Sequence, residues 1–159
     1  MLTESQIETV WKRKIEAEVR SLYFADFAHR YSRRRQMITF ATFFLSSGAA
    51  TTLAAKAALW VSLMLTVLIA LLNAYALAVG LERLVRTMAK LHYSWNQIGT
   101  DYDRLWNHTW EDGAEGVFED LLRRERDLSE LAATEAPNDQ RVMGRWEDHV
   151  FQQYGLSNA

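Results

Sequence analysis

The chain has 159 residues, a formal net charge of −2, one proline, seven glycines and no cysteine. This length fits one membrane unit together with one small helical module, and the scarcity of proline and glycine favours long helices. The absence of cysteine excludes disulfides, cysteine-ligated metals and a thiol nucleophile.

Residues 1–35 are predicted to form an N-terminal amphipathic cytosolic helix. Thr3 with Gln6, or Ser5 with Glu8, has the spacing of a capping box. An apolar stripe then recurs at spacings of four and three, at Ile7, Trp11, Ile15, Val19 and Leu22. Aromatic residues follow it at Tyr23, Phe24, Phe27 and Tyr31. They are open to two interpretations, a lipid- or partner-binding patch or, as we favour, packing against a neighbouring helix.

Residues 36–81 are predicted to form a transmembrane hairpin, because two runs without charge occupy about 36–55 and 57–81. At about 1.5 Å of rise per residue, each run is long enough to cross a hydrocarbon core of roughly 30 Å. Lys56 stands between them and marks the predicted tip. The alternative, a buried hairpin of a soluble protein, is disfavoured because a soluble bundle of this size needs a polar face on nearly every helix.

Basic residues flank both runs, and the tip holds only Lys56. They are candidates for fixing topology and for binding lipid headgroups: Arg33, Arg34, Arg35, Arg83, Arg86 and Lys90. The positive-inside rule then places both termini in the cytoplasm of a bacterial inner membrane. A charged stretch of about 35 residues precedes the first run, so a cleavable signal peptide is not expected.

Polar residues inside the two runs are the candidate intramembrane site. They are Ser46, Ser47, Thr51, Thr52, Ser62, Thr66 and Asn73. Two interpretations are open. Asn73 locks the hairpin or an oligomer by hydrogen bonding, which we favour, or it lines a wet path together with the serines and threonines once several hairpins assemble.

Residues 82–159 are predicted to form a cytosolic helical region, with helices at about 82–110, 114–134 and 139–154. The first should continue the second membrane helix without a break. Its apolar residues alternate at spacings of four and three, the pattern of an oligomer seam, at Leu84, Met88, Leu91, Trp95, Ile98, Tyr102 and Leu105. Whether this seam pairs within one chain or between chains is left open.

Two further features of this region have ordinary explanations. Trp106, His108 and Trp110 stand close together, either as a ligand pocket or, as we favour, as an aromatic cap on a helical bundle. The segment 111–135 is strongly acidic, which is typical of a solvated face. Pro137 ends its helix, and Asn138 or Asp139 can cap the last one.

No catalytic signature accompanies this architecture. The four histidines have no metal-ligand spacing, no phosphate-binding glycine loop is present, and the basic residues gather beside the apolar runs rather than on a nucleic-acid-binding face. The sequence therefore predicts no enzymatic activity, no cofactor, no metal and no nucleic acid.

The order of these elements resembles the bacterial SLATT family over nearly the whole chain. The resemblance is carried by the membrane hairpin, by the stretch RTMAKLHYSWNQIGTDYDRLW and by LAATEAPNDQRVMGRWEDHVFQQYG, with its turn at Glu135-Ala136-Pro137. It implies a two-pass effector in antiphage defence that an upstream sensor or nucleotide signal triggers to assemble and breach the membrane. This chain departs from many relatives of that kind in having no fused sensor domain, so a separate sensor or signal-generating protein is expected.

The predicted function is therefore a homo-oligomeric, pore-forming membrane effector whose partners are the lipid bilayer and a sensor. Two alternatives are retained. One is a membrane-anchored helical scaffold that recruits a partner protein. The other is a holin-like phage membrane protein, which the large cytosolic region disfavours.

Overall fold

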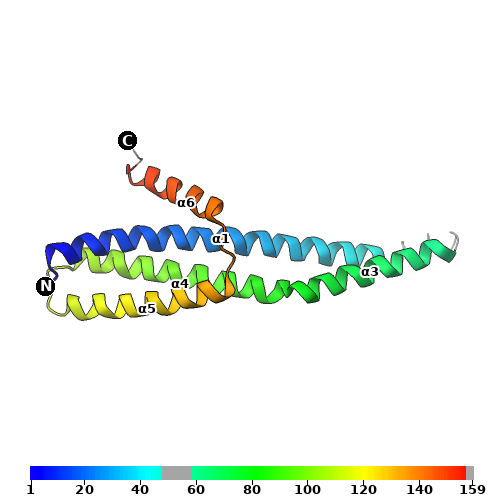
Figure 1. Ribbon diagram of the computed structural model, residues 1–159, viewed down its shortest axis with the longest axis horizontal. Helices are drawn as coiled ribbons and strands as arrows, with labels where there is room; N and C mark the ends of the chain where they lie inside the picture. Colours follow the sequence, from blue (N-terminus) through cyan, green and yellow to red (C-terminus); the bar gives the residue numbers. More distant parts are fainter. Residues whose placement is uncertain (48–58, 157–159) are drawn as a thin grey trace. The chain divides into compact units, whose positions relative to one another are not determined.

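The structure is a computed structural model that describes residues 1–47 and 59–156, apart from the side chains of residues 59, 61 and 62. Every regular element in these ranges is a helix, which confirms the all-α fold class. The helices are α1 (Glu4–Ser46), α3 (Leu59–Val79), α4 (Leu81–Asn107), α5 (Ala114–Glu135) and α6 (Gln140–Gln153) (Figure 1).

The helices divide into two compact units. Met1–Ala28 and Arg86–Ala159 form the first, here termed the bundle unit, and His29–Val85 form the second, termed the apolar unit. Helix α1 contributes to both, and each unit is described by itself below.

Helix α1 begins at the predicted capping box. The Thr3 backbone N–H donates to Oε1 of Gln6 at 2.8 Å, and the Gln6 N–H donates to Oγ1 of Thr3 at 3.3 Å. This reciprocal pair satisfies two of the N–H groups that a helix start leaves without partners. No glycine or proline occurs between Glu4 and Ser46, so nothing stops the helix at residue 35 and it continues into the first uncharged run.

In the bundle unit, α1, α4 and α5 pack around a shared core. Lys14 of α1 pairs with Asp103 of α4 at 2.5 Å, and Arg124 of α5 pairs with Asp101 of α4 at 2.9 Å. Gly99 of α4 lies opposite Ala17 of α1, where a Cβ on the glycine would stand 3.8 Å from that of Ala17. The two small residues let the helices approach closely.

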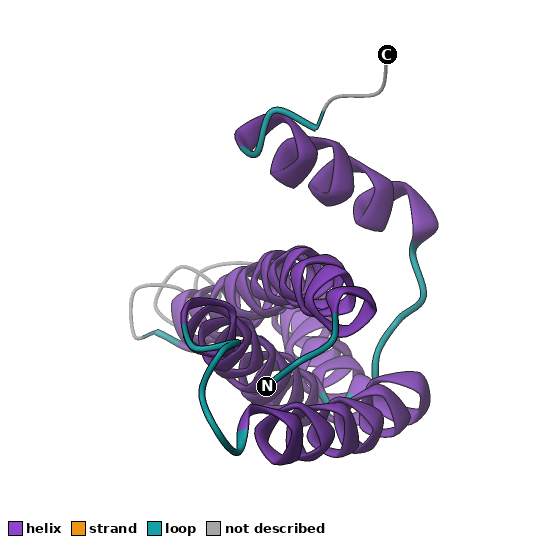
Figure 2. Cartoon of the chain, turned by 90° about the vertical axis from the view of Figure 1, so that its left-hand side faces the viewer, coloured by secondary structure: helices purple, strands orange, loops and turns teal. Residues whose placement is uncertain are grey.

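Helix α6 is set off from these three helices and joined to α5 by an extended loop (Figure 2). It packs against α1, where Val150 is buried in one apolar cluster with Ile15 and Val19. Asp139 caps its start by accepting from the N–H groups of Arg141 and Val142, as its position after Pro137 predicted.

The predicted helices at 82–110, 114–134 and 139–154 correspond to α4, α5 and α6, whereas the predicted end of the first run at 55 lies outside the described residues. An unbroken helix was expected across Leu81, and this expectation is wrong, because Gly80 separates α3 from α4. Gly80 has φ +61°, in the left-handed region, and its N–H donates to the Leu77 carbonyl at 3.0 Å. Glycine adopts this conformation readily because it has no Cβ.

Candidate functional site

Large apolar side chains cover the outside of the apolar unit. Leu77 is 81 % exposed and Phe43 is 74 % exposed. The same surface includes Met37, Phe40, Phe44, Trp60, Leu63, Met64 and Leu71. Among its described residues, Leu81 alone belongs to the buried apolar core. A soluble monomer rarely exposes an apolar surface of this extent, so this unit requires something to cover it.

Each helix of the apolar unit has one half-buried stripe. On α3 the stripe follows spacings of four and three, at Leu65, Ile69, Leu72 and Ala76, and on α1 it includes Ile38, Ala41, Thr42 and Leu45. The guanidinium of Arg34 on α1 lies 5.1 Å from the ring centre of Tyr75 on α3, which places the two helices side by side. The remaining faces of both helices are exposed.

The stretch Leu63–Asn107, which begins within α3 and runs through Gly80 to the end of α4, includes a window long and apolar enough to cross a membrane, and none of that window is buried. It is the one such helix within the described residues. The finding covers the second predicted membrane run. The first run is helical through Ser46, and the predicted tip at Lys56 lies outside the described residues.

Four of the seven predicted intramembrane polar residues have described side chains, two on α1 or just after it and two on α3. Ser46 donates to the Thr42 carbonyl at 2.7 Å and Ser47 donates to the Phe44 carbonyl at 2.7 Å, both within the same turn of chain. Asn73 and Thr66 are exposed on α3. Thr51, Thr52 and the side chain of Ser62 lie outside the described residues.

The predicted topology residues are all exposed: Arg33, Arg34, Arg35, Arg83, Arg86 and Lys90. The three consecutive arginines directly precede the exposed apolar surface that starts at Met37. Tyr75 lies beneath one of them, Arg34, in the cation–π contact. Charged side chains beside an aromatic ring and an apolar surface are typical of a membrane boundary.

Six of the seven predicted seam residues, from Met88 to Leu105, lie in the bundle unit, and Leu84 lies in the apolar unit. Met88, Leu91, Trp95, Ile98 and Tyr102 are 0 % exposed, Leu105 is 4 % exposed and Leu84 is half-buried. Of the two pairings left open by the sequence, the residues from Met88 to Leu105 follow the one within a single chain, because they are buried there. The physical reason is that α1 and α5 supply enough apolar surface to cover them within one chain.

The aromatic residues of α1 follow the packing interpretation. Tyr23, Phe24 and Phe27 are buried, and Tyr23 stacks edge-on against Phe24. The Tyr23 hydroxyl donates to the Pro137 carbonyl and accepts from the Asp139 N–H at 3.0 Å. The Tyr23 hydroxyl thus links α1 to the loop between α5 and α6.

The predicted aromatic cap forms only in part. Trp106 contacts Trp11 at 5.2 Å between ring centres, whereas Trp110 is 69 % exposed. The residue between His108 and Trp110, Thr109, is buried and accepts a hydrogen bond from the Leu2 N–H.

A buried polar network that the sequence did not predict crosses the bundle. Glu125 of α5 is 5 % exposed. One of its oxygens accepts from Arg13 of α1 and the other from the hydroxyl of Tyr102 on α4, each at 2.9 Å. Burial, together with the negative charge of Glu125, raises the pKa of Tyr102 well above its ordinary range.

A signal for Glu125 was present in the sequence. Ala114, Phe118, Leu121 and Glu125 follow spacings of four, three and four, so the carboxylate occupies a core position of α5. The acidic segment 111–135 is a solvated face elsewhere, but this one carboxylate needs partners because burying an unpaired charge is costly.

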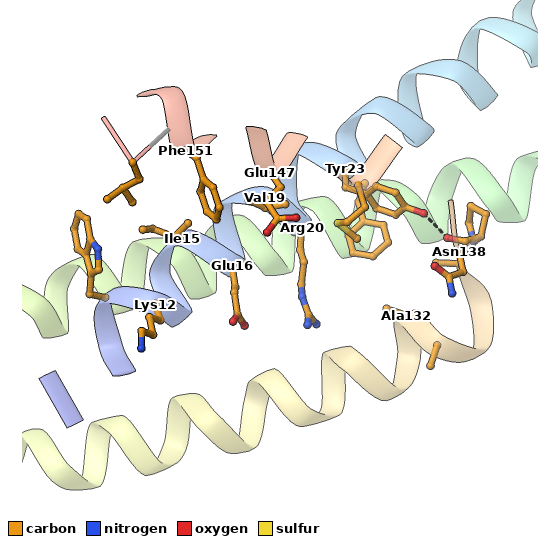
Figure 3. Close-up of a pocket in the computed structure, with 17 residues that line it drawn as sticks. Lys12, Ile15, Glu16, Val19, Arg20, Tyr23, Ala132, Asn138, Glu147 and Phe151 are labelled. Atoms are coloured by element: carbon orange, nitrogen blue, oxygen red, sulfur yellow. Dashed lines mark hydrogen bonds between the residues drawn. The ribbon is translucent and has the colours of Figure 1, made fainter. Parts of the chain in front are cut away.

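A groove of about 750 Å³ opens between α1, α6 and the end of α5. Its apolar lining includes Val19 and Phe151, and its charged lining includes Lys12, Glu16, Arg20 and Glu147 (Figure 3). The lining carries both signs of charge, so it does not select a strongly charged ligand.

The described residues contain no cluster of three histidine or acidic side chains that could hold a metal ion. Comparison of the chain with protein-family models, with curated proteins and with solved structures finds no match in any of the three. The two units described above are therefore the basis of the functional argument.

Proposed function

We propose that the chain is a two-pass inner-membrane effector. In this proposal α3 and the end of α1 belong to a transmembrane hairpin, both termini are cytoplasmic, and assembled copies permeabilise the membrane in response to an upstream sensor or nucleotide signal. The observation that carries the proposal is the exposed apolar surface of the apolar unit.

The large side chains of this surface gain free energy when they leave water. Removing a leucine or phenylalanine side chain from water contributes roughly 1.5 to 3 kcal/mol. Leu63, Leu71, Leu77, Phe40 and Phe43 are each at least 61 % exposed. A bilayer supplies the apolar environment for all of them at once, and helices are the elements that can lie in it without unsatisfied backbone groups.

The orientation in this proposal rests on charge. Three arginines precede the apolar surface of α1, and Arg83, Arg86 and Lys90 follow α3, so the basic flanks are expected on the cytoplasmic side. The bundle unit would then lie in the cytoplasm, where its ion pairs and charged surface are hydrated.

Permeabilisation requires assembly, because two helices cannot enclose a pore. The polar residues of the hairpin, among them Thr66 and Asn73, are the candidates for the surface that water or another hairpin contacts. The resemblance to SLATT effectors is the source of the defence role and of the expected sensor.

The test measures membrane potential in bacteria that express the chain with its genomic neighbours. Triggering the system is expected to depolarise the cells, as read by a potential-sensitive dye. Replacing Asn73 with leucine and Thr66 with valine should abolish depolarisation while leaving the amount of membrane-bound protein unchanged. An intact potential with abundant, assembled wild-type protein contradicts pore formation.

The groove favours a second candidate, a membrane-anchored scaffold that binds a partner protein. Its volume and its partly apolar lining suit a protein segment. Under this function Phe151→Ala, which removes a ring from the groove, should abolish partner recruitment, and the Asn73→Leu/Thr66→Val variant should act like wild type. The two sets of substitutions therefore separate the two functions.

A further inference from the structure

Helix α3 has two stripes with the same spacing, and the chain covers one of them. The half-buried stripe at Leu65, Ile69, Leu72 and Ala76 is the covered one. A second stripe, here termed the outer seam, follows spacings of three, four, three and four and consists of Leu63, Thr66, Ala70, Asn73 and Leu77. All five of its residues are exposed.

The outer seam has the periodicity of a helix–helix contact. A repeat of 3.5 residues keeps one stripe of a helix facing a partner along its whole length. Leu63 and Leu77, which are 62 % and 81 % exposed, bracket the seam, and the small Ala70 lies at its centre. The leucines can pack across such a contact, and the alanine lets two backbones come close.

Asn73 is the residue that points to a specific partner. Its amide offers two N–H donors and one carbonyl acceptor, yet no described residue forms a hydrogen bond with that side chain. Its neighbours along the helix are apolar, since Leu72, Ala74 and Leu77 surround it. An amide facing hydrocarbon without a partner is costly, and lipid tails have no group that could satisfy it.

We infer that the outer seam binds the outer seam of a second copy of this chain within the bilayer, with the two Asn73 side chains hydrogen-bonded to each other. This inference rests on the proposed membrane function. A carboxamide is self-complementary, because each copy donates an N–H to the carbonyl oxygen of the other, as a two-fold contact requires. A single polar residue in a heptad seam also fixes the register of the two helices.

The bundle unit strengthens the choice of this face. The stripe from Met88 to Leu105 is already buried within one chain and is not free to join copies. The opposite exposed face of α3 consists of Met64, Leu68, Leu71 and Tyr75, and Tyr75 is already in contact with Arg34 of α1. The outer seam is the face of α3 on which a second copy provides hydrogen-bond partners for the Asn73 amide.

Cysteine cross-linking of the full chain in bacterial membranes tests the inference, because the natural chain has no cysteine. Single variants Ala70→Cys and Leu77→Cys report on the outer seam, and Leu68→Cys and Leu71→Cys are matched controls on the opposite face. After mild oxidation, the seam variants are expected to form disulfide-linked dimers at least fivefold more than the controls. Adding Asn73→Leu to Leu77→Cys should reduce dimer formation at least threefold.

Membrane integration is measured in the same samples by resistance to alkaline carbonate extraction. A carbonate-resistant chain whose four cysteine variants cross-link equally, or not at all, overturns the outer seam and leaves the proposed membrane function standing. A chain that carbonate extracts overturns the membrane function and the seam together. Unchanged cross-linking after Asn73→Leu overturns the role of the amide alone.

Discussion

The apolar side chains of the two units differ in exposure, because one unit buries them and the other leaves them on its surface. In the bundle unit, Trp95 and Leu91 are fully buried and charged side chains occupy the surface. In the apolar unit, Leu77 and Phe43 are among the most exposed side chains, although the helices are just as regular. The difference shows that helical periodicity specifies which residues share a face but not whether the chain buries that face.

Polar residues show the same contrast. In the bundle unit a carboxylate, a guanidinium and a phenol from three helices meet at Glu125. In the apolar unit Ser46 and Ser47 bond to carbonyls of their own turn, and Asn73 stays exposed. Polar groups in the first unit therefore join different helices, whereas Ser46 and Ser47 of the second bond only within their own turn.

The largest predicted effect concerns the core of the bundle unit. Trp95→Ala removes a fully buried ring that also lies 4.6 Å from the guanidinium of Arg20, and it should lower the free energy of unfolding by about 3 to 5 kcal/mol. Tyr93→Ala, which truncates a 67 % exposed ring on the same helix, should change it by no more than about 0.5 kcal/mol. Circular dichroism during denaturation in detergent measures both, and equal losses would mean that the exposed face of α4 is covered.

The next effect tests whether the apolar unit lies in lipid. Leu71→Arg places a charge in the middle of α3 and should cost about 2.5 to 3.5 kcal/mol of membrane insertion. The matched control is Val117→Arg, because Val117 is 51 % exposed in the bundle unit and its replacement should leave insertion unchanged. Carbonate extraction measures the inserted fraction, and full insertion of Leu71→Arg would contradict a lipid environment for this face.

The buried network should give a smaller loss. Glu125→Ala leaves Arg13 and the hydroxyl of Tyr102 without their shared acceptor, so stability should fall by roughly 2 to 3 kcal/mol. Glu130→Ala, on the exposed surface of the same helix, is the control and should be nearly neutral. Thermal unfolding compares the two variants, and a neutral Glu125→Ala would show that the network adds no stability.

The smallest effect concerns the attachment of α6. The hydroxyl of Tyr154 donates to Glu18 at 2.8 Å, and burial together with this hydrogen bond raises the pKa of Tyr154 to about 12. In the unfolded chain a tyrosine ionises near pH 10. The unfolded state therefore loses the proton first, and stability should fall as the pH rises from about 10 to about 12, with no change below that window.

Tyr154→Phe removes this group and should cost about 1 kcal/mol at neutral pH. It should also flatten the decline of the unfolding temperature between pH 10 and 12 relative to wild type. An identical decline in both proteins would assign the alkaline loss to other groups, of which Tyr102 is the first candidate.

Much of the fold could be predicted because local signals were strong. Pro137 and Asp139 place the break before α6, Thr3 and Gln6 set the start of α1, and the alternation from Met88 to Leu105 gives the buried face of α4. These signals depend on near neighbours in sequence, which an amphipathic pattern records directly.

The remaining features depend on contacts between distant residues or on one backbone angle. Nothing in the sequence near Glu125 shows that Arg13 lies opposite, 112 positions away. The pattern of α6 predicts an apolar face but not that Ile15 and Val19 cover it. Gly80 is the one glycine of the uncharged run 57–81. The composition of that run does not indicate that this glycine adopts a positive φ.

Gly80 has one more consequence, which concerns helical phase. In an unbroken helix every added residue turns all later side chains by about 100°, so the length of α3 would dictate which side of α4 meets the core. The left-handed residue between Val79 and Leu81 interrupts that continuity. A one-residue insertion beside Gly80, outside the buried stripe of α4, should therefore be tolerated far better than one beside Trp95, which would turn that stripe out of the core.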